Sequence, residues 1–298
     1  LDALMKHADI AMYEAKRAGR NCARYFLREM NEALDERIAI ETALRRALTS
    51  QGLSLVYQPK LRLADMEFVG VEVLLRWHDP ERGAIEPDRF IPVAEDCGLI
   101  KAIDAWVLEQ ACAQLAAWRR QGLSVPGISV NASPLRFHHD DVAAHARALF
   151  ERHGLAAQDL TLEVTERLML DDGSRASAQL AQLHEMGVRI SVDDFGTGYS
   201  SLSYLKRMPV TELKIDKSFV RELEHEAGDR ALVSAIVGIG RALLFTVVAE
   251  GVETLGQQQI LLELGCDAAQ GWRFGRPMAA AALEHWLMRP STTGMFGD

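Results

Sequence analysis

Short apolar runs alternate with longer helical patterns along most of this chain. From residue 53 onward, eight mainly apolar runs have the length and composition of β-strands. These runs cover residues 54–60, 68–77, 127–131, 159–164, 188–193, 211–216, 245–249 and 267–274. Between most of them, apolar residues recur with the spacing of one helix face, at residues 100–120, 174–186, 230–243 and 255–264. The pattern therefore predicts an α/β fold in which strands and helices alternate.

The helix at 255–264 has the clearest termini. Thr254 and Gln257 have the spacing of a capping box, and Gly265 stands where a helix commonly ends. Two further helices are predicted near the N-terminus, at residues 4–18 and at about 28–50.

Two architectures fit eight strands that alternate with helices. One is a (β/α)8 barrel of the TIM type, and the other is an open, doubly wound sheet. The hydrophobic pattern alone is compatible with both, so the positions of the polar residues have to decide between them.

Polar side chains gather in and just beyond the C-terminal parts of seven of the runs. They are Glu72 and Arg76, Asn131, Glu163 and Glu166, Asp193 and Asp194, Lys214 and Asp216, Glu250 and Glu253, and Gln270. Buried carboxylates are costly unless they are paired or bound to a metal. So many of them can meet only if parallel strands form a closed ring with one shared mouth, which is where barrel enzymes keep their chemistry. The polar residues therefore favour the barrel.

The acids and the amide in this set are hard oxygen ligands, and no histidine or cysteine stands among them. That composition suits Mg²⁺ or Mn²⁺ better than zinc. Adjacent acids such as Asp193 and Asp194 can share a carboxylate between two ions, and two ions about 3.5–4 Å apart stabilise an in-line phosphoryl displacement. The alternative is a purely structural network of carboxylates.

Charge and cysteine content narrow the range of partners. The formal net charge is -9 and the pI is about 5.5, which argues against a broad basic face for a nucleic-acid polymer. The four cysteines have no zinc-ligand spacing and fit a reducing, cytoplasmic compartment. The longest apolar stretch, residues 231–249, is interrupted by Gly238, Gly240 and Arg241 and does not read as a membrane span. Because the chain begins with Leu1, we expect a piece of a longer protein, whose membrane association would depend on upstream regions.

A series of short motifs carries a resemblance to a known family. In order they are Tyr57-Gln58-Pro59, Glu72-Val73-Leu74-Leu75-Arg76-Trp77, Phe90-Ile91-Pro92-Val93-Ala94-Glu95, Ser129-Val130-Asn131-Ala132-Ser133, Leu162-Glu163-Val164-Thr165-Glu166, residues 193–202 (DDFGTGYSSL), Leu213-Lys214-Ile215-Asp216, Ala249-Glu250-Gly251-Val252-Glu253-Thr254, and Gln270-Gly271. From about residue 38 to residue 290, the chain resembles the EAL domain, the cyclic di-GMP phosphodiesterase family. It departs from the usual pattern at Val73, where alanine is the signature residue, at Lys60 and at Trp272.

The resemblance implies a role for each matching position. The metal ligands would be Glu72, Asn131, Glu163, Asp193, Asp194 and Glu250, and they would hold two ions, Mg²⁺ or Mn²⁺. The catalytic group would comprise Glu250, Lys214, Asp216 and Glu166. Glu250 could be a general base or a metal ligand, Lys214 would orient the attacking water or form a plain ion pair, and Glu166 would anchor the segment 194–202. The substrate-binding group would comprise Gln58, Arg76, Gln270 and Glu253. Arg76 would meet a phosphate unless it forms a structural salt bridge, and Glu253 would position other groups.

The resemblance also implies an activity and a form. The expected reaction is hydrolysis of cyclic di-GMP to linear 5′-pGpG on a barrel whose first strand is antiparallel, in a homodimer. The intact segment 194–202 favours an active enzyme over two alternatives, a silent cyclic di-GMP receptor and a barrel enzyme with another substrate.

The N-terminal residues resemble a different family. Residues 1–26 resemble the closing helix of a GGDEF domain, the diguanylate cyclase family, although its catalytic signature is absent from the chain. We therefore expect four regions: a GGDEF remnant at 1–26, a helical linker at 27–50, the barrel at 51–290 and a tail at 291–298.

Overall fold

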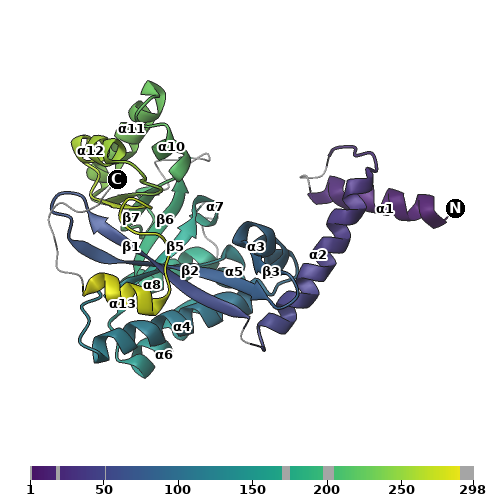
Figure 1. Ribbon diagram of the computed structural model, residues 1–298, viewed down its shortest axis with the longest axis horizontal. Coiled ribbons are helices and arrows are strands. Elements are labelled where there is room, and N and C mark those ends of the chain that lie inside the picture. Colours follow the sequence, from purple (N-terminus) through teal and green to yellow (C-terminus); the bar gives the residue numbers. More distant parts are fainter. Residues whose placement is uncertain (1, 18–20, 51, 170–174, 197–204, 289–298) are drawn as a thin grey trace. The chain divides into compact units, whose positions relative to one another are not determined.

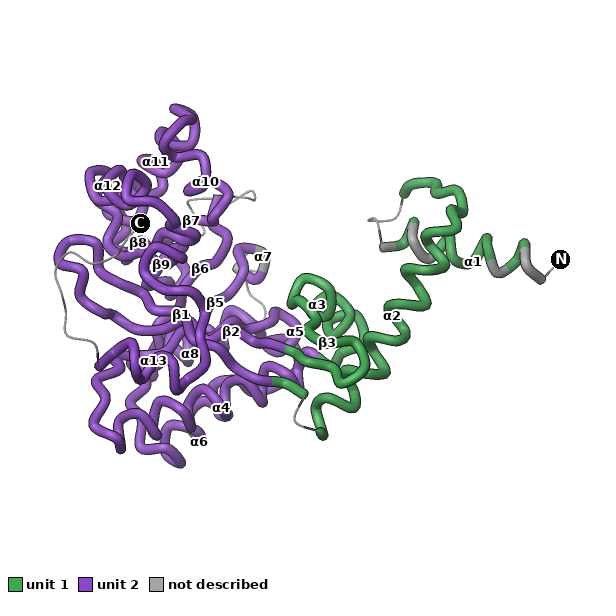
Figure 2. Tube along the Cα trace, in the orientation of Figure 1, with its two compact units in different colours: residues 1–53, 77–99 green, residues 54–76, 100–298 purple. Residues whose placement is uncertain are grey.

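The computed structural model describes residues 2–17, 21–50, 52–169, 175–196 and 205–288 (Figure 1). The chain forms two compact units, one made of residues 1–53 and 77–99 and the other of residues 54–76 and 100–298 (Figure 2). The predicted tail at 291–298 lies outside the described residues, as do residues 18–20 of the predicted GGDEF remnant.

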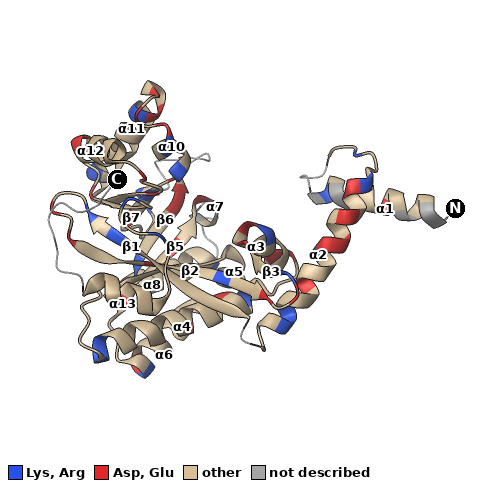
Figure 3. Cartoon of the chain, viewed as in Figure 1, with Lys and Arg blue, Asp and Glu red and all other residues tan. Residues whose placement is uncertain are grey.

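The smaller unit is mainly helical. It contains α1 (Asp2–Arg17), α2 (Arg28–Ala47), β3 (Gly83–Ile85) and α3 (Pro87–Asp96). Acidic and basic residues are interspersed along α2 (Figure 3), and ion pairs from Arg37 to Asp96 and from Arg89 to Glu36 connect α2 to α3. The helices α1 and α2 were predicted, whereas α3 was missed because Pro92 inside it interrupts the helical pattern.

The larger unit is a closed barrel of eight strands. These are β1 (Leu53–Arg62), β2 (Phe68–Asp79), β4 (Ile128–Asn131), β5 (Leu160–Thr165), β6 (Arg189–Phe195), β7 (Glu212–Ile215), β8 (Thr246–Ala249) and β9 (Ala268–Gln270). The strand order is β1-β9-β8-β7-β6-β5-β4-β2, and a pairing of β1 with β2 closes the ring. Strands β2 and β4 to β9 are parallel, whereas β1 runs antiparallel to β9 with Lys60 opposite Gln270. The predicted barrel and its antiparallel first strand are confirmed.

Helices follow the strands of this unit. They are α4 (Ile100–Arg120), α5 (Pro134–His139), α6 (Val142–His153), the 3₁₀ turn η1 (Ala157–Asp159), α7 (Glu166–Met169), α8 (Arg175–Glu185), α10 (Lys217–Arg221), α11 (Ala227–Leu243), α12 (Leu255–Leu264) and α13 (Ala280–Leu287). The predicted capping box of α12 is present, and Gly265 ends this helix with a positive φ of 84°. Among the described helices, none combines the length and the apolar character needed to cross a membrane.

Alternate residues of each barrel strand have different surroundings. In β5, Leu162 and Val164 alternate with Thr161 and Glu163, and all four are buried. The apolar set faces the surrounding helices, and the polar set faces the barrel axis. The buried inner residues are Gln58, Lys60, Glu72, Ser129, Thr161, Glu163, Ser191, Glu212, Lys214 and Gln270. The interior of this barrel is thus a polar network rather than an apolar core.

The last strand is shorter than predicted. The sequence suggested a strand to residue 274, but β9 ends at Gln270 and the chain then turns. The backbone N–H of Val252 donates to the carbonyl of Gln270, so that Gly271 lies against the backbone of Val252. A Cβ atom at position 271 would stand 2.1 Å from the Val252 carbonyl oxygen, so only glycine fits this approach.

Candidate active site

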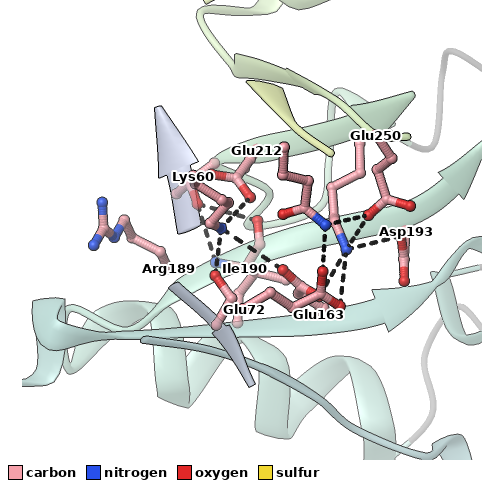
Figure 4. Close-up of polar contacts among 12 residues, drawn as sticks. Lys60, Glu72, Glu163, Arg189, Ile190, Asp193, Glu212 and Glu250 are labelled. Atoms are coloured by element: carbon pink, nitrogen blue, oxygen red, sulfur yellow. Dashed lines mark hydrogen bonds and ion pairs between the residues drawn. The ribbon is translucent and has the colours of Figure 1, made fainter. Parts of the chain in front are cut away.

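The ammonium group of Lys214 lies among four acids at the carboxyl end of the parallel strands. Figure 4 labels these acids, Glu72, Glu163, Asp193 and Glu250. Its Nζ atom lies 2.5 Å from Glu250 Oε1, 2.8 Å from Glu163 Oε2, 3.2 Å from Asp193 Oδ1 and 3.5 Å from Glu72 Oε1. Burial would lower the pKa of Lys214, but these carboxylates, led by Glu163 and Glu250, hold it well above its usual value. One cation therefore lies in contact with four acids.

Glu72 accepts hydrogen bonds from two side-chain amides. Its Oε1 atom accepts a bond from Asn131 Nδ2 at 3.0 Å, and its Oε2 atom accepts one from Gln270 Nε2. Burial would raise the pKa of Glu72, but Lys214 and the bond from Gln270 lower it to about 2. The structure therefore keeps Glu72 ionised.

The pKa values of Glu163 and Glu250 are shifted in the opposite direction. Burial and the nearby charge of Glu72 raise the pKa of Glu163 well above its usual value, although two lysines oppose the shift. Burial also raises the pKa of Glu250 to about 7, despite its contact with Lys214. A carboxylate with a pKa near neutrality can take up a proton during a reaction.

The two aspartates at the end of β6 differ in conformation. Asp194 has a positive φ of 53°, a conformation that non-glycine residues rarely adopt, and its backbone N–H donates to Asp193 Oδ1. Burial, Asp193 and Asp216 raise the pKa of Asp194 to about 6. Asp216 also caps α10 by accepting bonds from the backbone N–H and the hydroxyl group of Ser218. Asp216 therefore reaches the site through Asp194 and not through Lys214.

The four predicted substrate-binding residues differ in their relation to the acid cluster. Gln270 belongs to the acid cluster, since its amide also donates to Glu250 Oε1 at 3.3 Å. Gln58 donates to the Gly275 carbonyl. Arg76 donates to the Leu75 carbonyl and, within the described part of the chain, has no carboxylate at salt-bridge distance, so its charge is available to an anion. Glu253 is exposed, and its carboxylate forms no hydrogen bond or ion pair with the other described residues of the site.

The predicted anchor, Glu166, begins α7. Both of its carboxylate oxygens are inaccessible to solvent and accept no hydrogen bond among the described residues. The segment it was expected to anchor lies outside those residues from 197 to 202.

No role was predicted from the sequence for three buried groups, Lys60, Ser129 and Glu212. They lie on the side of the site where the parallel strands begin. Lys60 donates to Ser129 Oγ and forms an ion pair with Glu212. Their signal was present in the sequence, because Lys60 shares a strand face with Gln58 on β1, and Glu212 shares one with Lys214 on β7.

The chemistry of the site fits divalent cations. Its donors are all oxygen atoms, and the carboxylates in contact with Lys214 outnumber that cation. Glu163 Oε1 and Gln270 Oε1 are buried acceptors that receive no hydrogen bond in the described chain. The acids point at Lys214 Nζ, and no three of those described surround a separate point that an ion could fill.

Comparison with known proteins identifies relatives of the whole barrel. The sequence model of a family described as EAL domain matches residues 41–277. A bifunctional diguanylate cyclase/cyclic di-GMP phosphodiesterase from Pseudomonas aeruginosa, MucR, is 48% identical over 280 residues, which are 94% of this chain and 41% of MucR. The cyclic di-GMP phosphodiesterase NbdA of the same organism is 40% identical over 284 residues, 95% of this chain and 36% of NbdA. The chain thus spans less than half the length of these relatives.

Solved structures give the same picture. A structure of the P. aeruginosa MucR phosphodiesterase in complex with cyclic di-GMP has a TM-score of 0.79 and 48% sequence identity. That similarity covers 82% of this chain and 99% of the MucR chain.

Proposed function

The chain belongs to the EAL domain family, and on that premise we propose that its barrel hydrolyses cyclic di-GMP to linear 5′-pGpG with the help of divalent cations. The observation that carries the proposal is the convergence of Glu72, Glu163, Asp193 and Glu250 on Lys214 at the carboxyl end of the barrel. The cyclic di-GMP complex of the MucR phosphodiesterase supports the choice of ligand.

Each group of the site has a part in this proposal. The cations, Mg²⁺ or Mn²⁺ and two in number, would be held by Glu72, Asn131, Glu163, Asp193, Asp194 and Glu250. When bound, they offset the negative charge on the attacking and leaving oxygens of an in-line displacement.

The remaining steps belong to side chains of this chain. The guanidinium group of Arg76, which has no acidic partner among the described residues, binds a phosphate oxygen of the substrate. Lys214 orients a water molecule, and Glu250, with a pKa of about 7, takes up the proton as the water oxygen bonds to phosphorus. The bond from phosphorus to the 3′ oxygen breaks, the 3′ oxygen takes up a proton from water, and Glu250 returns its own proton to the solvent. The product is the linear dinucleotide. Gln58 and Glu253 would help to hold and orient the nucleotide, and Asp216 and Glu166 would position the residues around Asp194.

The test is direct. The purified chain is incubated with cyclic di-GMP in Mg²⁺, Mn²⁺, Ca²⁺ or a chelator, and the nucleotides are separated by chromatography. We expect 5′-pGpG to form in Mg²⁺ or Mn²⁺ and not in the chelator. The Glu72→Ala variant should form none, and near-wild-type turnover by that variant would exclude the proposed cation site. Tight nucleotide binding without product in any divalent cation would instead identify a cyclic di-GMP receptor.

The form of the protein is a further part of the proposal. We propose a cytoplasmic homodimer, with membrane association only through regions outside this chain. Light scattering with size-exclusion chromatography measures the mass in solution, and a monomer at micromolar concentration would exclude the dimer.

A further inference from the structure

The polar network continues through the barrel beyond the candidate site. A cavity of about 580 Å³ lies at the opposite end, where the parallel strands begin, and it is lined in part by Lys60, Arg189 and Glu212. Figure 4 shows Lys60 and Glu212 on one side of Glu163, and Asp193 and Glu250 on the other. Glu163 is therefore the residue at which the catalytic group and the group near the cavity meet.

Lys60 is the buried cation of this second group. Its side chain is 6% exposed, and its ammonium group donates to Ser129 Oγ. The same Nζ atom lies 3.6 Å from Glu212 Oε1 and 3.7 Å from Glu163 Oε1. Lys60 thus has one acid on the side of the cavity and one on the side of the site.

The two oxygens of Glu163 face different lysines. Oε2 accepts a hydrogen bond from Lys214 at 2.8 Å, whereas Oε1 accepts none in the described chain and lies 3.7 Å from the ammonium group of Lys60. The Glu163 side chain is fully buried, so solvent cannot supply a replacement partner. Without Lys60, the attraction of Lys214 would act on Glu163 unopposed.

We propose that Lys60 is a positioning residue for the hydrolysis, holding the Glu163 carboxylate between two lysines so that it remains directed at the cation site. This inference rests on the proposed function. Lys60 does not touch the reacting atoms, because it is buried on the cavity side of Glu163, away from the candidate site. Its loss should therefore lower kcat and leave the affinity for cyclic di-GMP unchanged.

Glu212 makes it possible to separate this role from simple stabilisation. In a Lys60→Met variant, Glu212 becomes a buried carboxylate without a cation, which alone destabilises the fold. Adding Glu212→Gln removes that charge and should restore the melting temperature. It does not restore the lost partner of Glu163, so kcat should stay low.

The experiment compares the wild type, K60M, E212Q and K60M/E212Q. The matched control is R189M, which removes a cation from the same cavity, because the Arg189 guanidinium contacts the Gln158 carbonyl and points away from Lys60. We expect kcat to fall roughly tenfold or more in K60M and in K60M/E212Q. E212Q and R189M should keep kcat within about twofold of the wild type. If kcat recovers together with the melting temperature in K60M/E212Q, Lys60 is only structural and the proposal is wrong.

A second readout is independent of turnover. Mn²⁺ binding to E212Q and to K60M/E212Q is measured by calorimetry without nucleotide. Removing a nearby cation would by itself strengthen Mn²⁺ binding, so weaker binding to the double variant is the specific sign of a displaced Glu163. Equal or tighter binding would overturn the proposal. A wild-type chain that binds Mn²⁺ but forms no 5′-pGpG would contradict the proposed function, and this comparison would still test Lys60.

Discussion

At the scale of single residues, the acids of the site differ in what their charge does to the fold. Glu72 receives hydrogen bonds from Asn131 and Gln270, and its pKa lies far below the usual value. Asp194 has a strained backbone, and the pKa of its carboxyl group is raised to about 6 by burial and by Asp193 and Asp216. The folded state therefore favours the charge on Glu72 and disfavours the charge on Asp194 at neutral pH.

Neutral substitutions at these two positions should act on stability in opposite directions. Glu72→Gln is expected to cost ~1–3 kcal/mol, because a charged acceptor of two hydrogen bonds is lost. Asp194→Asn is expected to raise the melting temperature, because repulsion is removed and asparagine tolerates a positive φ. Both variants should lose turnover by ~10²-fold or more. Melting in a chelator at pH 7 and turnover in Mn²⁺ are the measurements, and a stabilised E72Q would contradict the assignment of its charge.

At this scale, the part of the site that could be predicted is what the alternation of side chains along a strand determines. This alternation identifies which face of a strand a residue occupies, so the convergence of Glu72, Glu163 and Lys214 was predictable. It does not give the depth of a residue in the barrel, which depends on register and strand direction. Because β1 is antiparallel, Lys60 lies nearer than Gln58 to the end of the barrel where the parallel strands begin. Lys60 therefore reaches Glu163 from that end. That relation could not be predicted from one chain.

At the scale of elements, helix caps were predictable and the irregular segments were not. The capping box of α12 depends on local chemistry that the sequence displays directly. The end of β9 depends on the approach of Val252, which is distant in sequence from Gly271 and close in space. Long-range contacts of this kind have no local signal.

The turn after β9 gives a prediction at this scale. Gly271→Ala should displace the backbone, because its Cβ would overlap Val252. We expect a loss of stability of ~2–4 kcal/mol together with reduced turnover, since Gln270 holds Glu72 and is adjacent to the clash. Gly228→Ala on α11 is the control, because a Cβ there meets nothing within 4 Å. Equal melting temperatures for the two variants would contradict the close approach of Gly271 to the backbone of Val252.

The connection between α5 and α6 predicts a dependence on pH. His145 on α6 contacts the guanidinium group of the buried Arg136, and burial and that cation lower the pKa of His145. Only a neutral imidazole can accept from Arg136, so protonation disfavours the fold. Because the folded pKa lies below the unfolded value of about 6.5, stability from this contact is present at higher pH and is lost as the pH falls below that value.

Chemical unfolding of the wild type and of His145→Gln between pH 7.5 and 5 measures this effect. The wild type should lose more stability on acidification than the variant, which cannot be protonated. Parallel profiles for the two proteins would show that His145 does not titrate differently on folding.

At the scale of the whole molecule, the N-terminal helix lies outside the residues that match the family. The match begins at residue 41, and α1 ends at Arg17. We propose that residues 1–26 are the remnant of a cyclase domain and take no part in hydrolysis. A chain that begins at residue 27 should keep kcat within about twofold of the full chain. A larger loss would assign these residues a role in the activity. The full chain measured in parallel, with circular dichroism of both, is the control for folding.

The division of barrel strands such as β2, β4 and β5 into an apolar outer set and a polar inner set has a consequence for how the gene can vary. Apolar outer residues supply the burial that keeps the protein folded, and inner residues supply the chemistry. A scan of all substitutions should therefore show a period of two in these strands. Changes at Val71, Val130 or Leu162 would act mainly by reducing cellular abundance, and changes at their neighbours Glu72, Asn131 or Glu163 would reduce activity by more than any loss of abundance explains. A single-residue deletion within a strand would exchange the two sets, so such deletions should be absent from functional descendants of this sequence.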